Sequence, residues 1–434
     1  MIDKVREIAL KVLYEVDKNE AYSNIALDEA LNKVRKSSQK ITNKDIGFIS
    51  ELVYGTISWQ LTLDEIIKKY STIKLKKMST WILNILRMSM YQIVFLDKVP
   101  KSAAVNEGVN LAKRYGHRAS TSFVNAILRK VEKKDYEDMK KIKDDKERIA
   151  KTTSMPIWIV EKLLTQNTKL EVQKICEACN LRPKVYVRIN QLKTDGQSLR
   201  QELTKDGIIV EEQQENKDFL WLQNAKQIER IKAFEEGKFT VQDEAAGLIA
   251  RILNPKPGEK VLDACSSPGG KTTYMAEMMQ NQGEIVAWDL HEHRIKLVEQ
   301  TAKRLGISII QTEVKDATKY QEVYQEKFDK ILLDVPCLGL GVIKRKPDIK
   351  WKRKKEEIEE ISKIQKEILQ TCSGYLKVGG ELVYSTCSIL KEENEMVIEQ
   401  FLKVHKNFKL EKNRQIYPNE NTDGFFISKL KKLS

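Results

Sequence analysis

The second half of the chain alternates short apolar runs with amphipathic segments of helical period, and this alternation restricts the possible folds more than any other feature. The predicted strands are Lys260–Ala264, Ile285–Asp289, Ser308–Glu313, Lys330–Asp334 and Gly379–Ser385. Helices are predicted between them, at 271–280, 291–305 and 355–375. Such an order indicates an α/β fold with a parallel, doubly wound sheet.

The first 140 residues have a different period. Apolar residues recur at helical spacing, and strand patterns are nearly absent. Beyond the first two helical stretches, the predicted helices are 45–59, 63–70, 81–96, 103–115 and 121–130. We therefore expect an all-α bundle at residues 1–140. Its interleaved Lys and Arg residues suit either docking onto RNA or an ordinary solvated surface.

A third segment, 141–245, joins these two. A charge-dense run, 132–151, reads as a solvated helix or linker, and a helical pair at 156–178 follows it. Alternating apolar residues from 185, a short helix at 199–206 and strands at 208–210 and 219–221 then predict a small α+β unit of ferredoxin-like or RNA-recognition-like type. The last domain is expected at 246–434. Cys176 and Cys179 are read as buried small hydrophobes, because neither a second cysteine pair nor a nearby histidine completes a zinc site.

The charge balance favours a polyanionic partner. Among 434 residues, 76 Lys and Arg stand against 62 Asp and Glu, a net charge of +14, although such an excess also serves solubility. No secretory pattern opens the chain, and no apolar run is long enough to span a bilayer. Six scattered cysteines fit a reducing compartment. We expect a cytoplasmic protein with no membrane partner.

The loop that follows the fourth predicted strand combines unusual groups. The strand ends at Asp334, and Pro336 and Cys337 come next, where ligands of open α/β sheets bind. Gly339 and Gly341 leave room for close backbone approach. The basic residues beyond them suit a phosphate-bearing substrate; they are Lys344, Arg345, Lys346 and Lys350.

The turn after the first predicted strand, Cys265–Lys271, reads CSSPGGK, and Asp289 lies about twenty residues further on. This arrangement suits a nucleoside, whose ribose hydroxyls the carboxylate binds. The turn lacks both the GxGxxG pattern of dinucleotide sites and the Walker lysine spacing. S-adenosylmethionine has no pyrophosphate and needs neither pattern. An NAD site with a degenerate turn, or a sheet that binds nothing, remain as alternatives.

Two thiols are placed for chemistry. Cys337 follows the fourth predicted strand and Cys387 the fifth, and adjacent parallel strands end at the same edge of a sheet. Two thiols there are compatible with a disulfide, a metal pair or nucleophilic catalysis. A reducing compartment argues against the first, and the lack of a histidine beside them against zinc. Nucleophilic catalysis by a thiolate remains.

These motifs resemble those of a known family over nearly the whole chain. The stretches ELVYGTISWQLTLD and KSAAVNEGVNLAKRYGHRASTSFVNAILR are similar to a NusB-like RNA-binding domain. The catalytic-domain motifs are DACSSPGGKT, DVPCLGLGVIKRKPDIKW, YSTCS and DGFFISKL. Together they resemble the RsmB (Sun/Fmu) family of bacterial ribosomal RNA 5-methylcytosine methyltransferases. Leu338 stands where that family usually has a small hydroxyl residue.

The resemblance implies a class I methyltransferase domain with a Rossmann-like sheet, behind a NusB-like bundle and the small α+β subdomain. Its substrate would be 16S ribosomal RNA, at cytosine 967 in the standard numbering of that RNA. Cys387 would add to carbon 6 of cytosine, and Asp334 would hydrogen-bond or protonate the cytosine edge. Cys337 would help to remove the carbon 5 proton or to release the product. Lys271 would contact the reacting site or a ligand carboxylate.

The same resemblance implies S-adenosylmethionine as the cofactor, no metal, and a monomer. The cofactor would lie against Cys265, Ser266, Ser267, Pro268, Gly269, Gly270, Lys271 and Asp334. Asp289 would bind its ribose, and Asp316 would lie near its adenine.

Two alternatives to this function stay open in the sequence. One is the same chemistry on transfer RNA, since catalytic motifs do not report the RNA substrate. The other is a non-catalytic RNA-binding or antitermination factor, which the bundle alone would support. The presence of Asp334, Cys337 and Cys387 together argues against it, because a binder needs no thiol pair at that edge.

Overall fold

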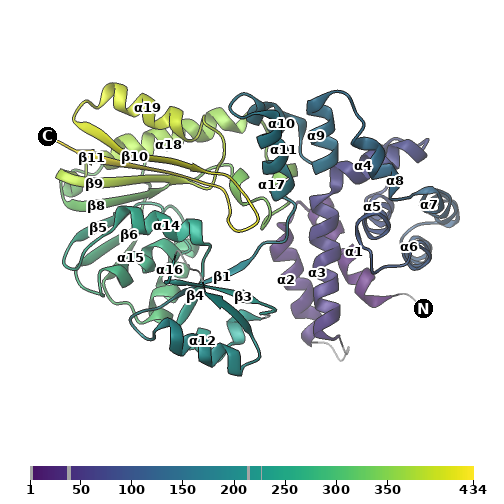
Figure 1. Cartoon of the computed structure of the whole chain (residues 1–434), viewed down its shortest axis with the longest axis horizontal. Coiled ribbons are helices and arrows are strands. Elements are labelled where there is room, and N and C mark those ends of the chain that lie inside the picture. Colours follow the sequence, from purple (N-terminus) through teal and green to yellow (C-terminus); the bar gives the residue numbers. More distant parts are fainter. Residues whose placement is uncertain (1–2, 37–40, 213–215, 226) are drawn as a thin grey trace. The chain divides into compact units, whose positions relative to one another are not determined.

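The computed structural model describes residues 3–36, 41–212, 216–225 and 227–434, and the chain divides into two compact units. The helical unit is Met1–Leu181 with Ile343–Arg353, and the sheet unit is Arg182–Val342 with Lys354–Ser434. Figure 1 shows the elements of both. None of the described helices is long and apolar enough to cross a membrane.

The helical unit contains no strand among its described residues, which confirms the predicted all-α bundle. Its α-helices are α1 (Lys4–Lys18), α2 (Ser23–Lys36), α3 (Asn43–Ser58), α4 (Gln60–Tyr70), α5 (Thr80–Phe95), α6 (Lys101–Tyr115), α7 (Arg118–Lys130), α8 (Lys134–Met139), α9 (Asp145–Thr153), α10 (Ile157–Leu164), α11 (Lys169–Ala178) and α17 (Ile349–Lys352). A single turn of 3-10 helix, η1, spans Leu75–Lys77.

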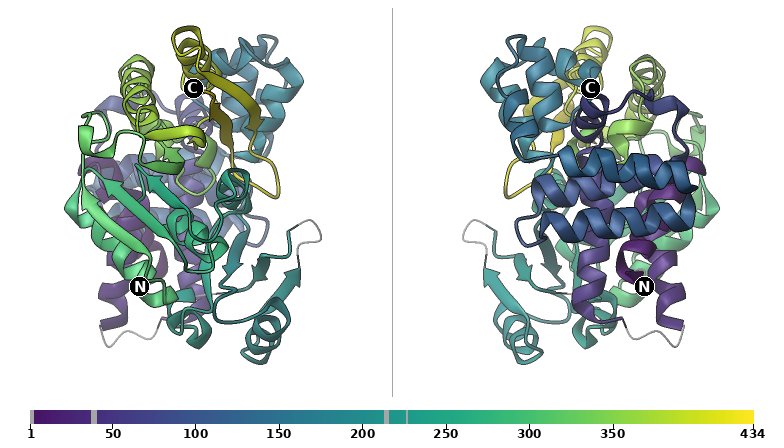
Figure 2. Two further views of the ribbon diagram at one scale, coloured as in Figure 1. Left: turned by 90° about the vertical axis from the view of Figure 1, so that its left-hand side faces the viewer. Right: turned by 90° about the vertical axis from the view of Figure 1, so that its right-hand side faces the viewer.

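Capping side chains explain where helices α3 and α5 begin, and burial of apolar residues explains how the helices pack. Thr42 and Asp45 form a capping box at the start of α3, and the Ser79 hydroxyl accepts a hydrogen bond from the backbone of Ile82 at the start of α5. α5 is buried on most sides and packs against α1, α3 and α6, while α6 packs in turn against α7. The right-hand view of Figure 2 shows helices of this bundle lying side by side.

The segment Ile343–Arg353 belongs to the helical unit, although it follows the predicted catalytic loop in sequence. Lys350 is only 1% exposed, and its ammonium donates to the backbone oxygens of Ser58 and Ser154 and to the side chain of Asn180, at 3.1, 3.2 and 2.6 Å. The Trp351 indole donates to Ile57 O at 2.8 Å. The expectation that Lys350 contacts phosphate is therefore wrong, because its charge is buried inside the bundle.

Burial lowers the pKa of Lys350 from its ordinary value of 10.5 to about 8. Between these two values the unfolded chain holds a proton that the folded chain has released, so the free energy of unfolding rises with pH there. We predict that wild type gains stability over Lys350→Met between about pH 7.5 and about pH 9.5, by on the order of 1–3 kcal/mol. Thermal unfolding of both proteins across this range measures it. Parallel pH curves would contradict the prediction.

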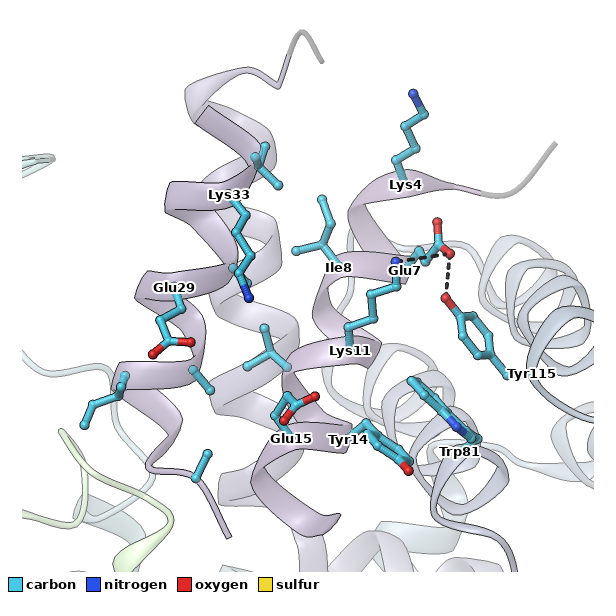
Figure 3. A pocket seen from close by; sticks show the side chains of 16 residues that line it. Lys4, Glu7, Ile8, Lys11, Tyr14, Glu15, Glu29, Lys33, Trp81 and Tyr115 are labelled. Carbon is cyan, nitrogen blue, oxygen red and sulfur yellow. Dashed lines mark hydrogen bonds and ion pairs between the residues drawn. The ribbon is translucent and has the colours of Figure 1, made fainter. Parts of the chain in front are cut away.

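A cavity of about 720 Å³ opens between α1 and α2 of the helical unit. One wall is a stack of three rings, with centroids 3.9 Å apart for Tyr14 and Trp81 and 4.4 Å apart for Trp81 and Tyr115. Figure 3 shows this wall, with lysine and glutamate side chains around the apolar floor. None of the predicted site residues lines this cavity, so it is separate from the predicted chemistry.

The sheet unit is built on a sheet whose described strands follow the order β10-β11-β9-β8-β5-β6-β7. The strands are β5 (Lys260–Asp263), β6 (Glu284–Asp289), β7 (Ile310–Val314), β8 (Phe328–Asp334), β9 (Leu376–Thr386), β10 (Phe408–Ile416) and β11 (Phe425–Lys432). Strands β5 to β9 pair in parallel, as predicted, whereas β10 and β11 form an antiparallel hairpin at the edge. The hairpin was not predicted, because β10 is lysine-rich and mostly exposed.

Helices cover both faces of this sheet (Figure 1). They are α14 (Glu244–Leu253), α15 (Gly270–Met278), α16 (Glu292–Leu305), α18 (Glu357–Ser373) and α19 (Glu395–Val404), and two short 3-10 turns, η3 (Glu322–Tyr324) and η4 (Leu340–Val342), complete the connections. Side chains alternate along β8: Ile331 and Leu333 pack with α18 and α19, and Leu332 packs with α14, α15 and α16. The predicted doubly wound α/β fold is confirmed.

A small antiparallel sheet of order β2-β3-β1-β4 completes the sheet unit. Its elements are β1 (Val185–Ile189), α12 (Gly196–Lys205), β2 (Ile209–Glu212), β3 (Phe219–Gln223), η2 (Ile228–Arg230), α13 (Lys232–Glu235) and β4 (Phe239–Val241). Leu199 and Leu203 of α12 pack onto this sheet in one apolar cluster with Leu220. The predicted α+β subdomain is therefore present, and it belongs to the same compact unit as the large sheet.

Candidate active site

The carboxyl ends of β8 and β9 bring the two predicted reactive cysteines together. These strands pair in parallel with Asp334 opposite Ser385, so the residues that follow them leave the sheet at the same edge. Cys337 and Cys387 lie in those two loops, and their Sγ atoms are 3.2 Å apart. The contact with the Cys387 thiol and burial raise the pKa of Cys337 well above its ordinary value.

Both cysteine loops are fixed by one buried carboxylate, Glu393. It accepts a hydrogen bond from the backbone N–H of Leu338 at 2.9 Å and another from the hydroxyl of Ser388. Gln365 of α18 donates to the same carboxylate at 3.2 Å and to the backbone oxygen of Pro336 at 2.9 Å. Sequence reasoning missed Glu393, because the acidic stretch around it reads as a solvated surface.

A close backbone contact fixes the same loops from the other side. The N–H of Gly341 donates to Cys387 O at 2.9 Å, and the N–H of Gly424 donates to Gly341 O at 2.8 Å. A Cβ on Gly341 would lie 2.1 Å from Gly424 O, so only glycine fits here. This is the close approach that the sequence predicted for Gly341.

Lys271 and Asp334 form an ion pair at this edge. The Lys271 ammonium lies 2.6 Å from Asp334 Oδ2, and the Ser385 hydroxyl donates to Asp334 Oδ1 at 2.8 Å. Burial opposes the charge of Lys271, but the Asp334 carboxylate outweighs it and raises the pKa of the lysine. The lysine is therefore protonated at neutral pH, and both oxygens of the Asp334 carboxylate are held in place.

The predicted cofactor loop, Cys265–Lys271, is held by backbone contacts. Both the N–H and the hydroxyl of Ser266 donate to Trp288 O, at 2.8 and 2.9 Å. Gly269 adopts a left-handed backbone, φ +99°, and a Cβ there would lie 3.1 Å from the Cα of Val298 on α16. The loop thus runs close against α16 and then opens α15 at Gly270.

This loop borders a cavity of about 200 Å³. Its lining comprises Val241, Gln242, Asp243, Ala246, Asp263, Cys265, Ser266, Ser267, Pro268, Gly270, Lys271 and Asp334. Asp263 is 1% exposed, and its Oδ2 accepts a hydrogen bond from Thr272 at 2.7 Å. Its Oδ1 is buried and has no hydrogen-bond partner among the described residues. Burial raises the pKa of Asp263 to about 7. An unpaired buried carboxylate oxygen at a cavity favours a cationic or hydrogen-donating ligand.

The other two predicted cofactor carboxylates lie beyond this cavity's lining. Asp289 ends β6 and is 4% exposed, and its Oδ1 accepts a hydrogen bond from His291 N at 3.2 Å. Asp316 follows β7, and hydrogen bonds from the side chain and backbone of Thr318 lower its pKa. Because β6 pairs with β5, and β7 pairs with β6, these carboxylates follow the same edge of the sheet outward.

Comparison with known proteins agrees with this geometry. Family profiles match as NusB family over residues 3–133, as the ferredoxin-like domain of RsmF/B-like methyltransferases over 155–229, and as 16S rRNA methyltransferase RsmB/F over 250–431. The probable ribosomal RNA small subunit methyltransferase B of Bacillus subtilis is 38% identical, over 99% of this chain and 98% of its own length. The chain belongs to the RsmB family of 16S ribosomal RNA methyltransferases.

Further relatives of the RsmB family cover the chain equally well. Ribosomal RNA small subunit methyltransferase B of Proteus mirabilis is 31% identical, over 99% of this chain and 98% of its own. The crystal structure of PH0851 has a TM-score of 0.81 at 29% identity and covers 98% of each chain. The predicted family and the predicted class of fold, a NusB-like bundle with a ferredoxin-like subdomain and a methyltransferase domain, are confirmed.

This RsmB-family chain is therefore an enzyme, which removes the alternative of a non-catalytic binding factor. The site fits a methyl donor with a nucleoside part: the loop adopts a left-handed backbone at Gly269, where a Cβ would lie only 3.1 Å from the Cα of Val298, and Asp263 and Asp289 provide buried carboxylates. Sequence reasoning missed Gln242, Asp263 and Ser385 in this site. Asp263 alone carried a signal, as an acidic residue at the end of a buried strand.

We predict that Gly269→Ala destabilises the protein more than Gly258→Ala. Both glycines have left-handed backbones, φ +99° and +87°, but a Cβ at Gly258 meets nothing within 4 Å. Gly258→Ala should therefore cost only the backbone strain, about 1 kcal/mol, and Gly269→Ala should cost about 1–3 kcal/mol more, because the backbone of α16 has to move. Urea unfolding of both variants measures the difference, and equal losses would contradict the close packing of the loop.

Proposed function

We propose that this RsmB-family enzyme transfers a methyl group from S-adenosylmethionine to carbon 5 of cytosine 967 of 16S ribosomal RNA, through a covalent adduct on Cys387. The observation that carries the proposal is the pair of thiols 3.2 Å apart, next to the Lys271–Asp334 ion pair. Carbon 5 of cytosine is a poor nucleophile. Addition of a thiolate to carbon 6 makes carbon 5 enamine-like, so that it reacts with an electrophilic methyl group.

The two cysteines would have consecutive roles. Cys387 forms the bond to carbon 6, and after methyl transfer the carbon 5 proton has to leave so that the carbon–sulfur bond can break. Cys337 is within reach of the same ring, because its Sγ lies 3.2 Å from that of Cys387. Its raised pKa keeps it a thiol at neutral pH, so it first gives up its own proton to solvent. As the thiolate it would then take the carbon 5 proton, and the carbon–sulfur bond to Cys387 would break.

Asp334 would hydrogen-bond the cytosine edge, or protonate it as the adduct forms and so neutralise the negative charge that the thiolate brings to the ring. Ser385 and Lys271 fix both of its oxygens, which orients the carboxyl group before the base arrives. When bound, S-adenosylmethionine supplies the sulfonium methyl group. The loop Cys265–Lys271 would hold it, with Asp289 on the ribose hydroxyls and Asp316 near the adenine. The base reaches this site only when it is unstacked from the RNA.

A groove in the helical unit supports the RNA-binding part of the proposal. It has a volume of about 550 Å³ and lies between α6 and α7. It is lined by Lys101, Ser102, Val105, Asn106, Val109, Asn125 and Arg129. No acidic residue lines it, and its polar side chains have no side-chain hydrogen bond or ion pair with any other described residue. Two free cations beside two free amides suit the phosphates and base edges of RNA.

If the reaction proceeds through the proposed adduct, replacing Cys387 and replacing Cys337 should give different results. With 16S ribosomal RNA and methyl-labelled S-adenosylmethionine, Cys387→Ala should lose activity by on the order of 10³-fold or more and form no RNA adduct. Cys337→Ala should trap RNA covalently, because the adduct forms but is not resolved. Cys179→Ala, at a buried position in the helical unit, is the matched control and should retain activity. A denaturing gel shows the adduct, and nucleoside analysis shows 5-methylcytosine.

Three outcomes would contradict the proposal. Activity in Cys387→Ala would place the nucleophile elsewhere. Methylation at a position other than carbon 5 would exclude the adduct chemistry. Transfer RNA methylated in preference to 16S ribosomal RNA would support the substrate alternative that the sequence left open.

Neutralising the groove should weaken RNA binding. We predict that Lys101→Gln/Arg129→Gln lowers the affinity for 16S ribosomal RNA about tenfold at low salt and reduces the salt slope by about two, because two phosphate contacts are lost. Lys409→Gln/Arg414→Gln makes the same charge change at exposed residues of β10 and is the control. Filter binding at several salt concentrations measures both. Equal losses in the two double variants would show a non-specific charge effect and contradict an RNA contact at the groove.

A further inference from the structure

One arginine of the small subdomain is buried against the cofactor loop. Arg188 of β1 is 0% exposed, and its five N–H groups all have acceptors. Nε and Nη2 donate to the carboxylate of Glu277 at 3.0 and 2.8 Å, and Nη2 also donates to Thr273 Oγ1 at 3.1 Å. Nη1 donates to Gly270 O at 2.6 Å and to Gln242 Oε1. The small subdomain is thus joined directly to the start of α15.

This network determines which way the Gln242 amide points. Arg188 has only donors, so the oxygen of Gln242 faces it and the NH₂ group faces away. Gln242 is 7% exposed and lines the cavity, and a Cβ on Gly270 would lie 3.8 Å from its Nε2. Nε2 has no hydrogen-bond partner among the residues that the structure describes. An oriented, unused donor therefore faces the cavity beside the cofactor loop.

The same cavity has an unused acceptor, the buried Oδ1 of Asp263. A ligand that satisfies both groups has to carry an anionic or accepting group and a cationic or donating group close together. The amino-acid end of S-adenosylmethionine has this chemistry, a carboxylate next to an ammonium. Asp289, which suits the ribose, lies outside the cavity lining, whereas Lys271 and Asp334 at the reacting edge lie inside it.

We propose that Gln242, held by Arg188, binds the carboxylate of the amino-acid end of the cofactor. The inference rests on S-adenosylmethionine being the cofactor. The small α+β subdomain is then part of the cofactor site, and not only a module that holds RNA. Gln242 contributes a fixed donor, and Arg188 acts as a positioning residue through it.

Gln242→Glu tests this role in the full-length protein. The variant keeps an oxygen for Arg188 but puts a second carboxylate oxygen where Nε2 was, so a ligand carboxylate is repelled. Calorimetric titration with S-adenosylhomocysteine, which has the amino-acid end, should show a loss of affinity of about tenfold or more. Affinity for 5′-methylthioadenosine, which lacks that end, should stay within about twofold. Gln201→Glu, the same change at an exposed position of α12, should alter neither affinity.

The outcomes separate this inference from the proposed function. Equal loss for both ligands would show a structural role for Gln242, and no loss for either would show no contact; both results overturn the inference. If wild type binds neither ligand, the proposed cofactor itself is overturned. A loss confined to S-adenosylhomocysteine supports the assignment.

Discussion

The parallel pairing of β8 with β9 is the constraint on which the site depends. Because Asp334 lies opposite Ser385, the loops that follow begin at the same height, and their thiols come within 3.2 Å of each other. A one-residue slip would turn Asp334 to the other face and separate the thiols. The apolar side chains of β8 oppose such a slip, since Leu332 and Leu333 belong to the clusters on opposite faces. The position of the two thiols and the packing of the apolar side chains therefore depend on the same strand register.

Three buried charged groups hold the loops and segments whose positions the strand register does not determine. Glu393, Arg188 and Lys350 are each buried, and each is surrounded by hydrogen-bonding partners. An uncompensated charge in the interior is costly. The stable conformation is therefore the one that places hydrogen-bonding partners around each of these groups. Glu393 holds the cysteine loops, Arg188 holds the start of α15, and Lys350 anchors the segment Ile343–Arg353 within the helical unit. Each group joins segments that are distant in sequence.

The distance along the chain between a residue and its partners explains which residues the sequence could predict. Asp334, Cys337 and Cys387 were predicted as site residues because each lies at or just beyond the end of a strand, and strand ends are readable from local pattern. Glu393 and Gln242 were missed because their roles depend on partners far along the chain, such as Arg188 for Gln242. Lys350 was assigned to phosphate because a basic run looks solvated, although its burial depends on tertiary packing. The hairpin of β10 and β11 escaped because an exposed edge strand lacks the apolar pattern.

The charge of the site favours one of the nucleoside cofactors that the sequence left open. Asp263, Asp334 and Asp289 lie along the carboxyl edge, and Lys271 is paired with Asp334 at 2.6 Å. Among the described residues no cation hydrogen-bonds to Asp263, and burial raises the pKa of its carboxyl to about 7. A pyrophosphate would add negative charge beside these carboxylates. The positive charges of a sulfonium and an ammonium would instead offset the negative charge of the carboxylates. The electrostatics of the edge therefore favour S-adenosylmethionine over a dinucleotide, independently of the shape of the turn.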